Sequence, residues 1–544
     1  MADPSPLRRA LANREIRLAE LAWMLGIASE NAYLVALLVN AYLLGGIVEV
    51  GLTGVARTLP GGLLAPFIAG LGDRVPRHRL LLGVHLARAA LVGGLAIAAA
   101  TGGSTPVLLG LAAIEGIVAT LHRPSHMSLL PALASAPEEL VASNVVSGAA
   151  ENLGSLVGPA AGAALVAGPG IPIALAIPAV GFAAAAITIA LARPAAQPRV
   201  TGDRGTRRWR RGLDGLIALR EHPSARLIVG LGVTQTFVRG AMVVLLVAAS
   251  AELLGIGEQG YGVLQAAIGL GGLAGAIVIG MLAGSLRLTT ATLVGLALWG
   301  LPITIIGLLP FAPVAFAVLI VLGVGNATFD VGIFSLLQRN VPNQARAGVL
   351  GAFEGLISLT VALGALAAPV LAQAIGVRGG LIVIGLLLPG LALVAAPAVR
   401  RMEAQGVIPE LELGLLRGVP IFQPLPMTVL EQLAGSLVAA TFHPRDNVCV
   451  KGEPGDRFFI IAEGHANVVS GRKVIRRLGP GDSFGEIALL RDVPRTATVR
   501  AVDQLVTFAL LRDDFVYAVT GNPTAARQAD SVIGRRLEED ASRA

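Results

Sequence analysis

The sequence predicts a mainly α-helical membrane protein followed by a small β-roll with flanking helices. Three observations lead to this fold class. Apolar residues make up 54% of the 544-residue chain and charged residues only 14%, well below the ~25% of a soluble domain. Apolar stretches long enough to cross a ~30 Å hydrocarbon core recur up to residue 400. Beyond that point, short and partly alternating runs separated by Gly and Pro turns replace them.

The apolar stretches form two sets of six candidate spans, the arrangement of transporters built from repeated halves. The first set lies at residues 18–44, 48–71, 80–100, 107–134, 140–167 and 171–192. The second set lies at residues 227–251, 260–283, 288–309, 313–337, 348–375 and 381–399. The basic loop 193–221 joins the two halves, so we expect a membrane domain over residues 1–404 and a second domain over 405–544.

Arginines are concentrated on one side of these predicted spans. They precede the first span, fill the loop 193–221 and follow the last span, whereas loops 45–48, 101–105 and 168–171 contain no Lys or Arg. The positive-inside rule therefore places both termini and the second domain in the cytoplasm, with the spans in the cell (inner) membrane. Because the net charge of +7 follows from this topology, we expect the lipid bilayer as a partner and no nucleic acid.

The second domain reads as a small β-roll. Short strands are predicted at residues 448–450, 458–462, 466–469, 474–478 and 498–501. Turn signals such as Gly-Pro-Gly-Asp at 479–482 separate them. Helices are predicted at residues 427–436 before the roll and 523–539 after it.

Residues 484–499 (FGEIALLRDVPRTATV) predict a cradle for a phosphate-bearing ligand. Gly485 lacks a Cβ and lets the backbone approach a ligand closely. It opens a short helix over 486–490, whose free N–H groups suit an anion. Glu486 supplies an acceptor for a ribose hydroxyl, and the planar fork of Arg495 can hold two phosphate oxygens.

This segment resembles the phosphate-binding cassette of cyclic nucleotide-binding domains, whose pattern is FGE-x-A-L followed by P-R-x-A-T-V. The resemblance implies that Glu486 takes the ribose 2′-hydroxyl and Arg495 the cyclic phosphate. The remaining contacts are expected from Gly485, Ile487, Ala488 and Thr496. It also implies cAMP as the regulatory ligand, with cGMP left open by the Thr496 hydroxyl, and a C-terminal helix that closes over the base through a residue such as Arg527 or Ile533. In the alternative interpretation, Glu486 and Arg495 only pair with each other.

Two motifs of the first domain resemble those of the major facilitator superfamily. The loop 70–79 (GLGDRVPRHR) resembles the signature G-x-L-x-D-R-x-G-R-R, although Pro76 and His78 depart from it. The resemblance implies a charge latch between the halves made by Asp73, Arg74, Arg77 and Arg79.

The second motif, residues 154–163, resembles the antiporter motif G-x-x-x-G-P-x-x-G-G. It is carried by Gly154, Gly158, Pro159 and Gly162, with Ala163 in the last place. The resemblance implies an exporter of the twelve-helix drug- or siderophore-efflux branch. The same small residues also serve helix packing alone.

Ionisable residues inside the spans indicate a transport pathway, because a charge at the bilayer centre costs about 2.5–3.5 kcal/mol and needs a partner or a water-filled cavity. The candidates are Glu30, Arg57, Arg88, Glu115, His122, Arg123, His126 and Glu151 in the first half and Arg239, Asp330 and Glu354 in the second. The spacing of Glu115, His122 and His126 places them on one face of a single helix. Two interpretations stay open: these groups relay protons, with Glu30 and Glu115 as the coupling acids, or the acids and arginines pair as structural glue.

Together these features predict a secondary active transporter, a proton-coupled exporter of small molecules regulated by cytoplasmic cyclic nucleotide. The alternative is a membrane-anchored cyclic nucleotide sensor or scaffold whose transporter part no longer transports. We expect neither an enzyme nor a bound metal, because the sequence presents no nucleophile–base or metal-ligand constellation. A cyclic nucleotide-gated channel would require a filter motif and about six spans, and the sequence shows neither of these features.

Overall fold

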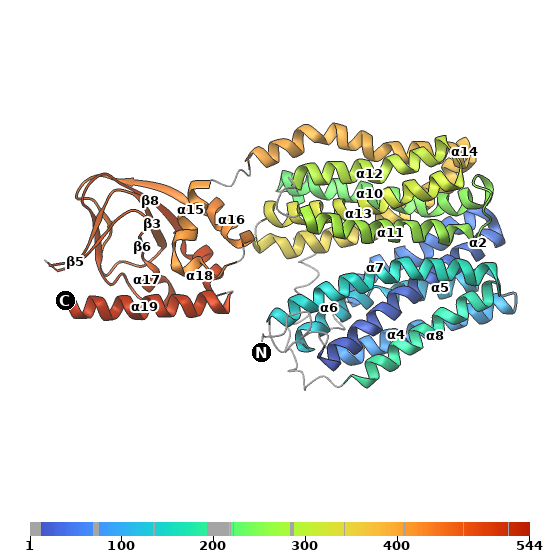
Figure 1. Cartoon of the computed structure of the whole chain (residues 1–544), viewed down its shortest axis with the longest axis horizontal. Helices are drawn as coiled ribbons and strands as arrows, with labels where there is room; N and C mark the ends of the chain where they lie inside the picture. Colours follow the sequence, from blue (N-terminus) through green and yellow to red (C-terminus); the bar gives the residue numbers. More distant parts are fainter. Residues whose placement is uncertain are drawn as a thin grey trace. The chain divides into compact units, whose positions relative to one another are not determined.

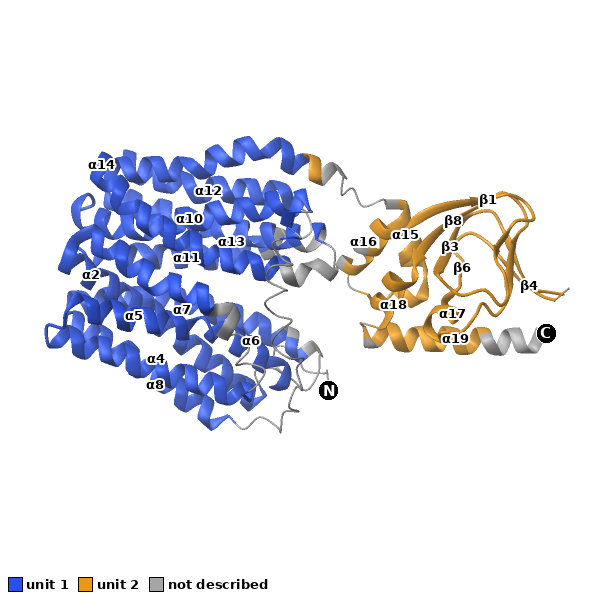
Figure 2. Cartoon of the chain, turned by 180° about the vertical axis from the view of Figure 1, so that it is seen from behind, with its two compact units in different colours: residues 1–400 blue, residues 401–544 orange. Residues whose placement is uncertain are grey.

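The chain forms two compact units in its computed structural model, residues 1–400 and 401–544 (Figure 2). The structure describes residues 12–68, 75–133, 137–192, 217, 219–220, 222–282, 288–341, 343–405, 410–425, 427–471, 473–520 and 522–543.

The first unit is a bundle of long apolar helices that run alongside one another (Figure 1). Its first half contains α2 (Arg14–Ile68), α4 (Arg77–Ala100), α5 (Thr105–Ala119), α6 (His122–Leu133), α7 (Pro137–Ala167) and α8 (Ile171–Leu191). Its second half contains α10 (Pro223–Glu252), α11 (Gly260–Leu282), α12 (Leu288–Leu308), α13 (Ala312–Asn340) and α14 (Asn343–Gln405). Large apolar side chains remain exposed on this bundle, among them Val180, Val370 and Val394, as expected of surfaces that face lipid.

Nine helices of the described residues are long and apolar enough to cross a membrane. The predicted membrane architecture is thereby confirmed. The predicted count of twelve spans, however, does not match the structure exactly. Helix α2 combines the first two predicted spans across non-helical backbone at Gly45 and Gly46, and α14 combines the last two across Gly376. Gly46 and Gly376 have φ values of 62° and 75°, which glycine adopts without strain. Helix α7 is not one of the nine.

The fourth predicted span differs from its prediction. It is not one continuous helix, because α5 ends at Ala119 and α6 begins at His122. Glu115 therefore lies on a different helical segment from His122 and His126, although Glu115 and His122 still contact the same residue, Arg88. The cause of the break is local: Pro124 follows in the first turn of α6, a position that proline favours and that helix interiors exclude.

Small residues bring α7 into close contact with α2. An added Cβ at Gly158 would lie 2.5 Å from the carbonyl oxygen of Ala28 and 2.8 Å from Cβ of Asn31, and one at Gly162 would lie 2.7 Å from the carbonyl oxygen of Ala32. The opposite side of α7 packs on α11, where a Cβ at Gly262 would lie 2.6 Å from the carbonyl oxygen of Pro159. Helix α7 therefore joins the two halves.

The second unit places a β-roll beside a helical layer. Helices α15 (Glu410–Gly418), η1 (Pro420–Phe422) and α16 (Met427–Ser436) precede the roll, and α18 (Arg512–Thr520) and α19 (Pro523–Arg543) follow it. One sheet has the order β1-β8-β3-β6 and the other β2-β7-β4-β5, with antiparallel pairing throughout. The strands are β1 (Val438–Phe442), β2 (Asn447–Cys449), β3 (Arg457–Glu463), β4 (Ala466–Ser470), β5 (Lys473–Leu478), β6 (Ser483–Phe484), β7 (Thr498–Ala501) and β8 (Leu505–Leu511).

The alternation of β3 divides the core of this unit in two. Phe459 and Ile461 point into the roll, where the Phe459 ring stacks 5.1 Å from that of Phe484. Phe458 and Ile460 point to the helical layer, where the Phe458 ring stacks 4.6 Å from that of Phe515. The five predicted strands are all present, whereas β1, β6, β8 and α18 were not predicted.

The packing of α7 on α2 generates a testable prediction. We expect Gly158→Val to lower the thermal stability of the purified protein, because overpacking at a closed contact costs about 1–3 kcal/mol. Gly148→Val is the matched control on the same helix, since nothing lies within 4 Å of a Cβ at Gly148. The measurement is the unfolding temperature in detergent, and equal shifts for the two variants would contradict the close contact.

Candidate functional site

Two buried and two partly buried charges form a closed cluster within the first half of the bundle. Glu30 accepts a hydrogen bond from Arg57 at 2.7 Å and from Arg88 at 3.1 Å. Glu115 is likewise paired with Arg57 at 3.2 Å and with Arg88 at 2.8 Å. Each carboxylate therefore contacts both guanidinium groups, and the cluster has no net charge. Such complete pairing offsets the desolvation that isolated charges would suffer.

The cluster is held by residues from three helices. Glu30 and Arg57 lie on the two arms of α2, Arg88 lies on α4 and Glu115 on α5. The side chains of Arg88 and Glu115 are 0% exposed, whereas that of Glu30 is 23% exposed. Two contacts that sequence reasoning missed complete the site. Tyr33 donates to Oε2 of Glu115 at 2.9 Å, and the Arg88 guanidinium lies 4.2 Å from the centre of the Phe182 ring.

Histidines extend from this cluster into the bundle. Nδ1 of His122 lies 3.3 Å from Nη1 of Arg88, and the His122 ring lies 4.9 Å from that of His85. His126 stacks on Trp23 with ring centres 4.4 Å apart.

His126 belongs to a second group of polar residues, which contains a further acid. Nε2 of His126 lies 3.3 Å from Oγ of Ser147, which donates to Oε1 of Glu20 at 2.6 Å. Glu20, Ser147 and His126 are all buried. Sequence reasoning missed Glu20, His85 and Ser147. The presence of Glu20 inside an apolar span was the available signal.

The other predicted pathway residues do not join the cluster. Arg123 and Glu151 form a separate and partly exposed ion pair at 3.0 Å. Asp330 accepts a hydrogen bond from Asn326 at 3.0 Å. Glu354 and Arg239 are exposed.

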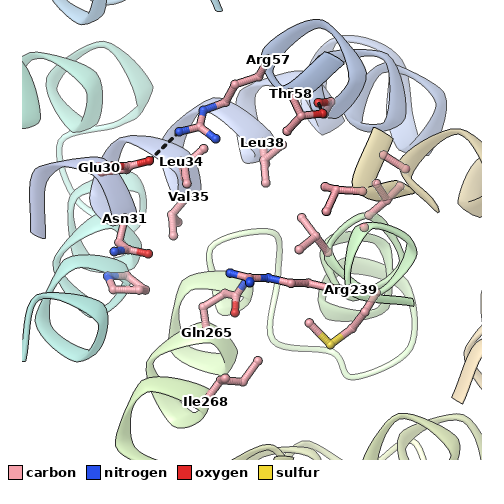
Figure 3. Close-up of a pocket in the computed structure, with 18 of the residues that line it drawn as sticks. Glu30, Asn31, Leu34, Val35, Leu38, Arg57, Thr58, Arg239, Gln265 and Ile268 are labelled. Atoms are coloured by element: carbon pink, nitrogen blue, oxygen red, sulfur yellow. Dashed lines mark hydrogen bonds and ion pairs between the residues drawn. The ribbon is translucent and has the colours of Figure 1, made fainter. Parts of the chain in front are cut away.

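A cavity of about 520 Å³ lies between the two halves and reaches the cluster (Figure 3). Glu30 and Arg57 line it from the first half, and Arg239 and Gln265 line it from the second. Apolar side chains such as Leu34, Leu38 and Ile268 contribute much of the remaining wall. Its volume falls within the 300–1,000 Å³ of small-molecule sites.

The predicted charge latch is only partly within the described residues. Asp73 and Arg74 lie outside them. Arg77 donates to the carbonyl oxygen of Ser128 at 2.9 Å, and Arg79 is exposed.

The second unit presents a polar cavity at the turn before α17 (Glu486–Leu490). Gly485 has a φ of 98°, in the left-handed region, and an added Cβ there would lie 2.6 Å from Nη1 of Arg495. Arg495 is 5% exposed and donates to the carbonyl oxygens of Gly485 at 3.2 Å and Arg457 at 2.7 Å. The glycine therefore leaves the space that this guanidinium fills.

The carboxylate of Glu486 is buried and half satisfied. Its Oε1 accepts a hydrogen bond at 2.7 Å from Arg536, a residue of α19 that also donates to the carbonyl oxygen of Ser483 at 2.8 Å. Its Oε2 has no hydrogen-bond partner among the described residues. In the part of the chain that the structure describes, Glu486 and Arg495 form no ion pair with each other. Both line the same cavity of about 70 Å³.

The cavity wall gathers the remaining predicted cradle residues. Ile487, Ala488 and Thr496 all line it, together with Arg536, which sequence reasoning missed. Cys449 lies in the same wall, and burial raises the pKa of its thiol. Ile533 is fully buried in the domain, and neither it nor Arg527 lines the cavity.

These features define a multi-pass membrane protein with a cavity between two helical halves and a ligand-binding β-roll. The family model described as Major Facilitator Superfamily matches residues 21–354, and the model described as Cyclic nucleotide-binding domain matches residues 440–520. The chain therefore belongs to the major facilitator superfamily and carries a C-terminal cyclic nucleotide-binding domain.

Relatives match over a limited part of the chain. A cyclic nucleotide-gated potassium channel of Mesorhizobium japonicum is 38% identical over 112 residues, which are 21% of this chain and 31% of the channel. A cAMP-dependent protein kinase regulatory subunit of Yarrowia lipolytica is 38% identical over 104 residues, 19% of this chain and 28% of that subunit. The chain thus spans less than a third of the length of these relatives.

A solved structure shows the same limited coverage. The regulatory domain of Toxoplasma gondii PKA with cAMP is 28% identical, with 21% of this chain and 45% of that chain covered and a TM-score of 0.20.

The cradle geometry predicts a specific effect on ligand affinity. We expect Gly485→Ala to weaken cyclic nucleotide binding by roughly tenfold or more, because the added Cβ displaces the Arg495 guanidinium and a charge-assisted hydrogen bond contributes about 1.5–3 kcal/mol. Gly471→Ala is the matched control: Gly471 also has a positive φ of 63°, and nothing lies within 4 Å of its Cβ position. Calorimetry of the full chain with cAMP and cGMP measures both variants. Equal losses would mean that backbone strain, and not the cradle, is responsible.

Proposed function

We propose that this protein is a secondary active transporter, a proton-coupled exporter of small molecules whose cycling is regulated by cyclic nucleotide. The observation that carries the transport part is the cavity between the halves, with a paired charge cluster in its wall. The proposal assigns cAMP, in preference to cGMP, to the cradle formed by Glu486 and Arg495. It places both termini on the cytoplasmic side of the cell (inner) membrane, as the positive-inside distribution of arginines favours.

Proton coupling is assigned to Glu30. Of the two clustered acids, Glu30 lines the cavity and is 23% exposed, whereas Glu115 is fully buried. A proton on Glu30 would remove one of the two carboxylates that hold Arg57 and Arg88 together. Protonation would thereby change the pairing between the two arms of α2 and α4, which is the kind of differential interaction that shifts a conformational equilibrium. Two buried groups of polar residues lie nearby, His122 beside Arg88 and the series His126, Ser147 and Glu20, and a proton would need a further polar link to pass between them.

Export is supported by the sequence motif of α7. Its glycines let this helix contact α2 and α11, so a movement of α7 changes the packing within one half and between the halves. We assign the chain to the drug- or siderophore-efflux branch on this basis.

Ligand binding is supported by the free oxygen of Glu486. A buried carboxylate oxygen without a partner is costly, and a ribose hydroxyl would satisfy it. The cavity of about 70 Å³ is small for a nucleotide, so binding requires the wall that Arg536 and α19 form to move.

The packing of the second unit supports a route by which a movement of α19 would reach other helices. Ala525, Ala529 and Val532 of α19 pack in one apolar cluster with Leu416 of α15 and Phe422 of η1. Helix α15 begins at Glu410, a few residues after α14 ends at Gln405. A displacement of α19 by nucleotide would therefore reach the chain that leaves the last membrane helix.

The regulatory proposal predicts a conformational response that needs no substrate. Spin labels on α2 and α11 in nanodiscs would report the distance between the halves with and without saturating cAMP. We expect cAMP to shift the distance distribution and Arg495→Ala to abolish the shift. Arg500→Ala is the matched control, since Arg500 is exposed on β7 and donates to Asn447. An unchanged distribution with cAMP bound would refute regulation of the membrane domain and favour a sensor or scaffold.

Proton coupling predicts a different defect. In everted vesicles with a pH-sensitive dye, we expect Glu30→Gln to abolish substrate-induced proton release across a panel of drug- and siderophore-like compounds. Glu151→Gln, which removes the acid of the separate pair with Arg123, should leave proton release largely intact. Full proton coupling in the Glu30→Gln variant would exclude the assignment.

A further inference from the structure

Arg239 is an unpaired charge in the wall of the central cavity. It lies on α10, its side chain is exposed to the cavity, and no hydrogen bond or ion pair joins it to any residue that the structure describes. In Figure 3 its guanidinium extends into the open space beside Gln265. A charge within the membrane is costly when unpaired, so this cation needs water or a ligand as its partner.

The other charges of the cavity wall already compensate each other. Glu30 and Arg57 are the remaining charged residues of the described lining. Both belong to the neutral cluster with Arg88 and Glu115. The charged side chains that line the cavity therefore sum to one net positive charge, which Arg239 supplies. Asp330, which accepts a hydrogen bond from the lining residue Asn326, attracts this charge electrostatically but forms no ion pair with it among the described residues.

The neutral polar groups near this charge are engaged with one another. Gln265 donates through its amide nitrogen to the hydroxyl of Tyr261 at 2.7 Å. Trp299 donates to Asn326 at 2.8 Å, and Asn326 donates to Asp330 at 3.0 Å. These bonds engage one N–H of Gln265 and one of Asn326, whereas no hydrogen bond to a described residue engages the guanidinium of Arg239, which is the charged donor of this part of the wall.

Apolar side chains of α2 lie across the cavity from the charge, beside the paired Glu30 and Arg57. These side chains are those of Leu34, Val35 and Leu38. Ile268 lies on the same side as Gln265 (Figure 3). A ligand that satisfies both surfaces carries one negative group and an apolar body. A planar carboxylate matches the fork of an arginine in a bidentate manner.

We infer that the substrate of the central cavity is a small organic acid, bound by its carboxylate to Arg239 with its apolar part between α2 and α11. To call this ligand a substrate rests on the proposed transport function. Binding of the acid at Arg239 does not itself require transport.

Binding to the purified full chain in nanodiscs tests the inference directly. The probes are 3-phenylpropanoate, 3-phenylpropanamide and 3-phenylpropylamine, which share a carbon skeleton and differ in charge. Saturable binding is read by the fluorescence of Trp299, which lines the cavity, and by thermal shift. We expect the acid to bind roughly tenfold or more tightly than the amide, and the amine not to compete, since a hydrogen bond to a charged group contributes about 1.5–3 kcal/mol.

Variants separate Arg239 from a general charge effect. Arg239→Gln should remove the preference for the acid, and Arg239→Lys should retain part of it because a point charge remains. Arg400→Gln, an exposed arginine near the end of α14 that does not line the cavity, should bind like the unmodified protein. Equal binding of acid and amide, unchanged acid binding in Arg239→Gln, or no Arg239-dependent binding would overturn the inference.

The result is distinguishable from failure of the proposed function. Arg239-dependent binding of the acid without measurable flux would support the anion site and reject transport. Flux of neutral or cationic compounds without acid binding would support transport and reject the anion site.

Discussion

The mutual neutralisation of two carboxylates and two guanidinium groups is the constraint on which the membrane domain depends. Glu30, Arg57, Arg88 and Glu115 come from three helices, and removal of any one of them leaves a buried charge without a full set of partners. Breaking a buried pair in this way costs about 3–5 kcal/mol. The same closure ties both arms of α2 to α4 and α5, so the helices that frame the cavity cannot separate without exchanging these partners. The same four residues therefore stabilise the fold and, on the proposed function, allow it to rearrange when one carboxylate is neutralised by a proton.

The second unit also buries a carboxylate and a guanidinium group, but these two groups have different partners. Its guanidinium, Arg495, donates to two backbone carbonyl oxygens and pairs with Asp456 at 3.5 Å, whereas its carboxylate, Glu486, is satisfied only on one side by Arg536. Glu486 lines a cavity of about 70 Å³, and Arg536 of α19 contributes to the wall. The carboxylate that we propose as the acceptor for a ribose hydroxyl is thus oriented by a residue of α19. The apolar anchoring of α19 on α15 and η1 makes this helix a structural link between the cradle and the start of the domain.

Much of this organisation could be predicted from the sequence, and the exceptions have physical causes. Length and hydropathy indicated the membrane helices, and the short helix at 486–490 was predicted with its observed bounds. Strand β8 was missed because the run LVTFALL is almost entirely apolar, and periodicity alone does not distinguish such a run from a buried helical segment. The break between α5 and α6 was missed because spacing alone assumes an uninterrupted helix. Glu20, His85, Tyr33 and Arg536 were missed because their roles arise from packing between segments far apart in the chain.

The net charge of the cavity has an electrical consequence. On the proposed assignment, an empty carrier would expose the positive charge of Arg239, whereas a monovalent acid bound there would neutralise that charge. The voltage dependence of a cycle would then fall mainly on the return of the empty form, while each completed cycle moves one negative charge. An inside-negative potential of about 100 mV contributes roughly 2.3 kcal/mol per charge, equivalent to about a fiftyfold concentration ratio. Outward movement of an anion would thus be electrogenic and favoured by the resting potential even before any proton gradient is used.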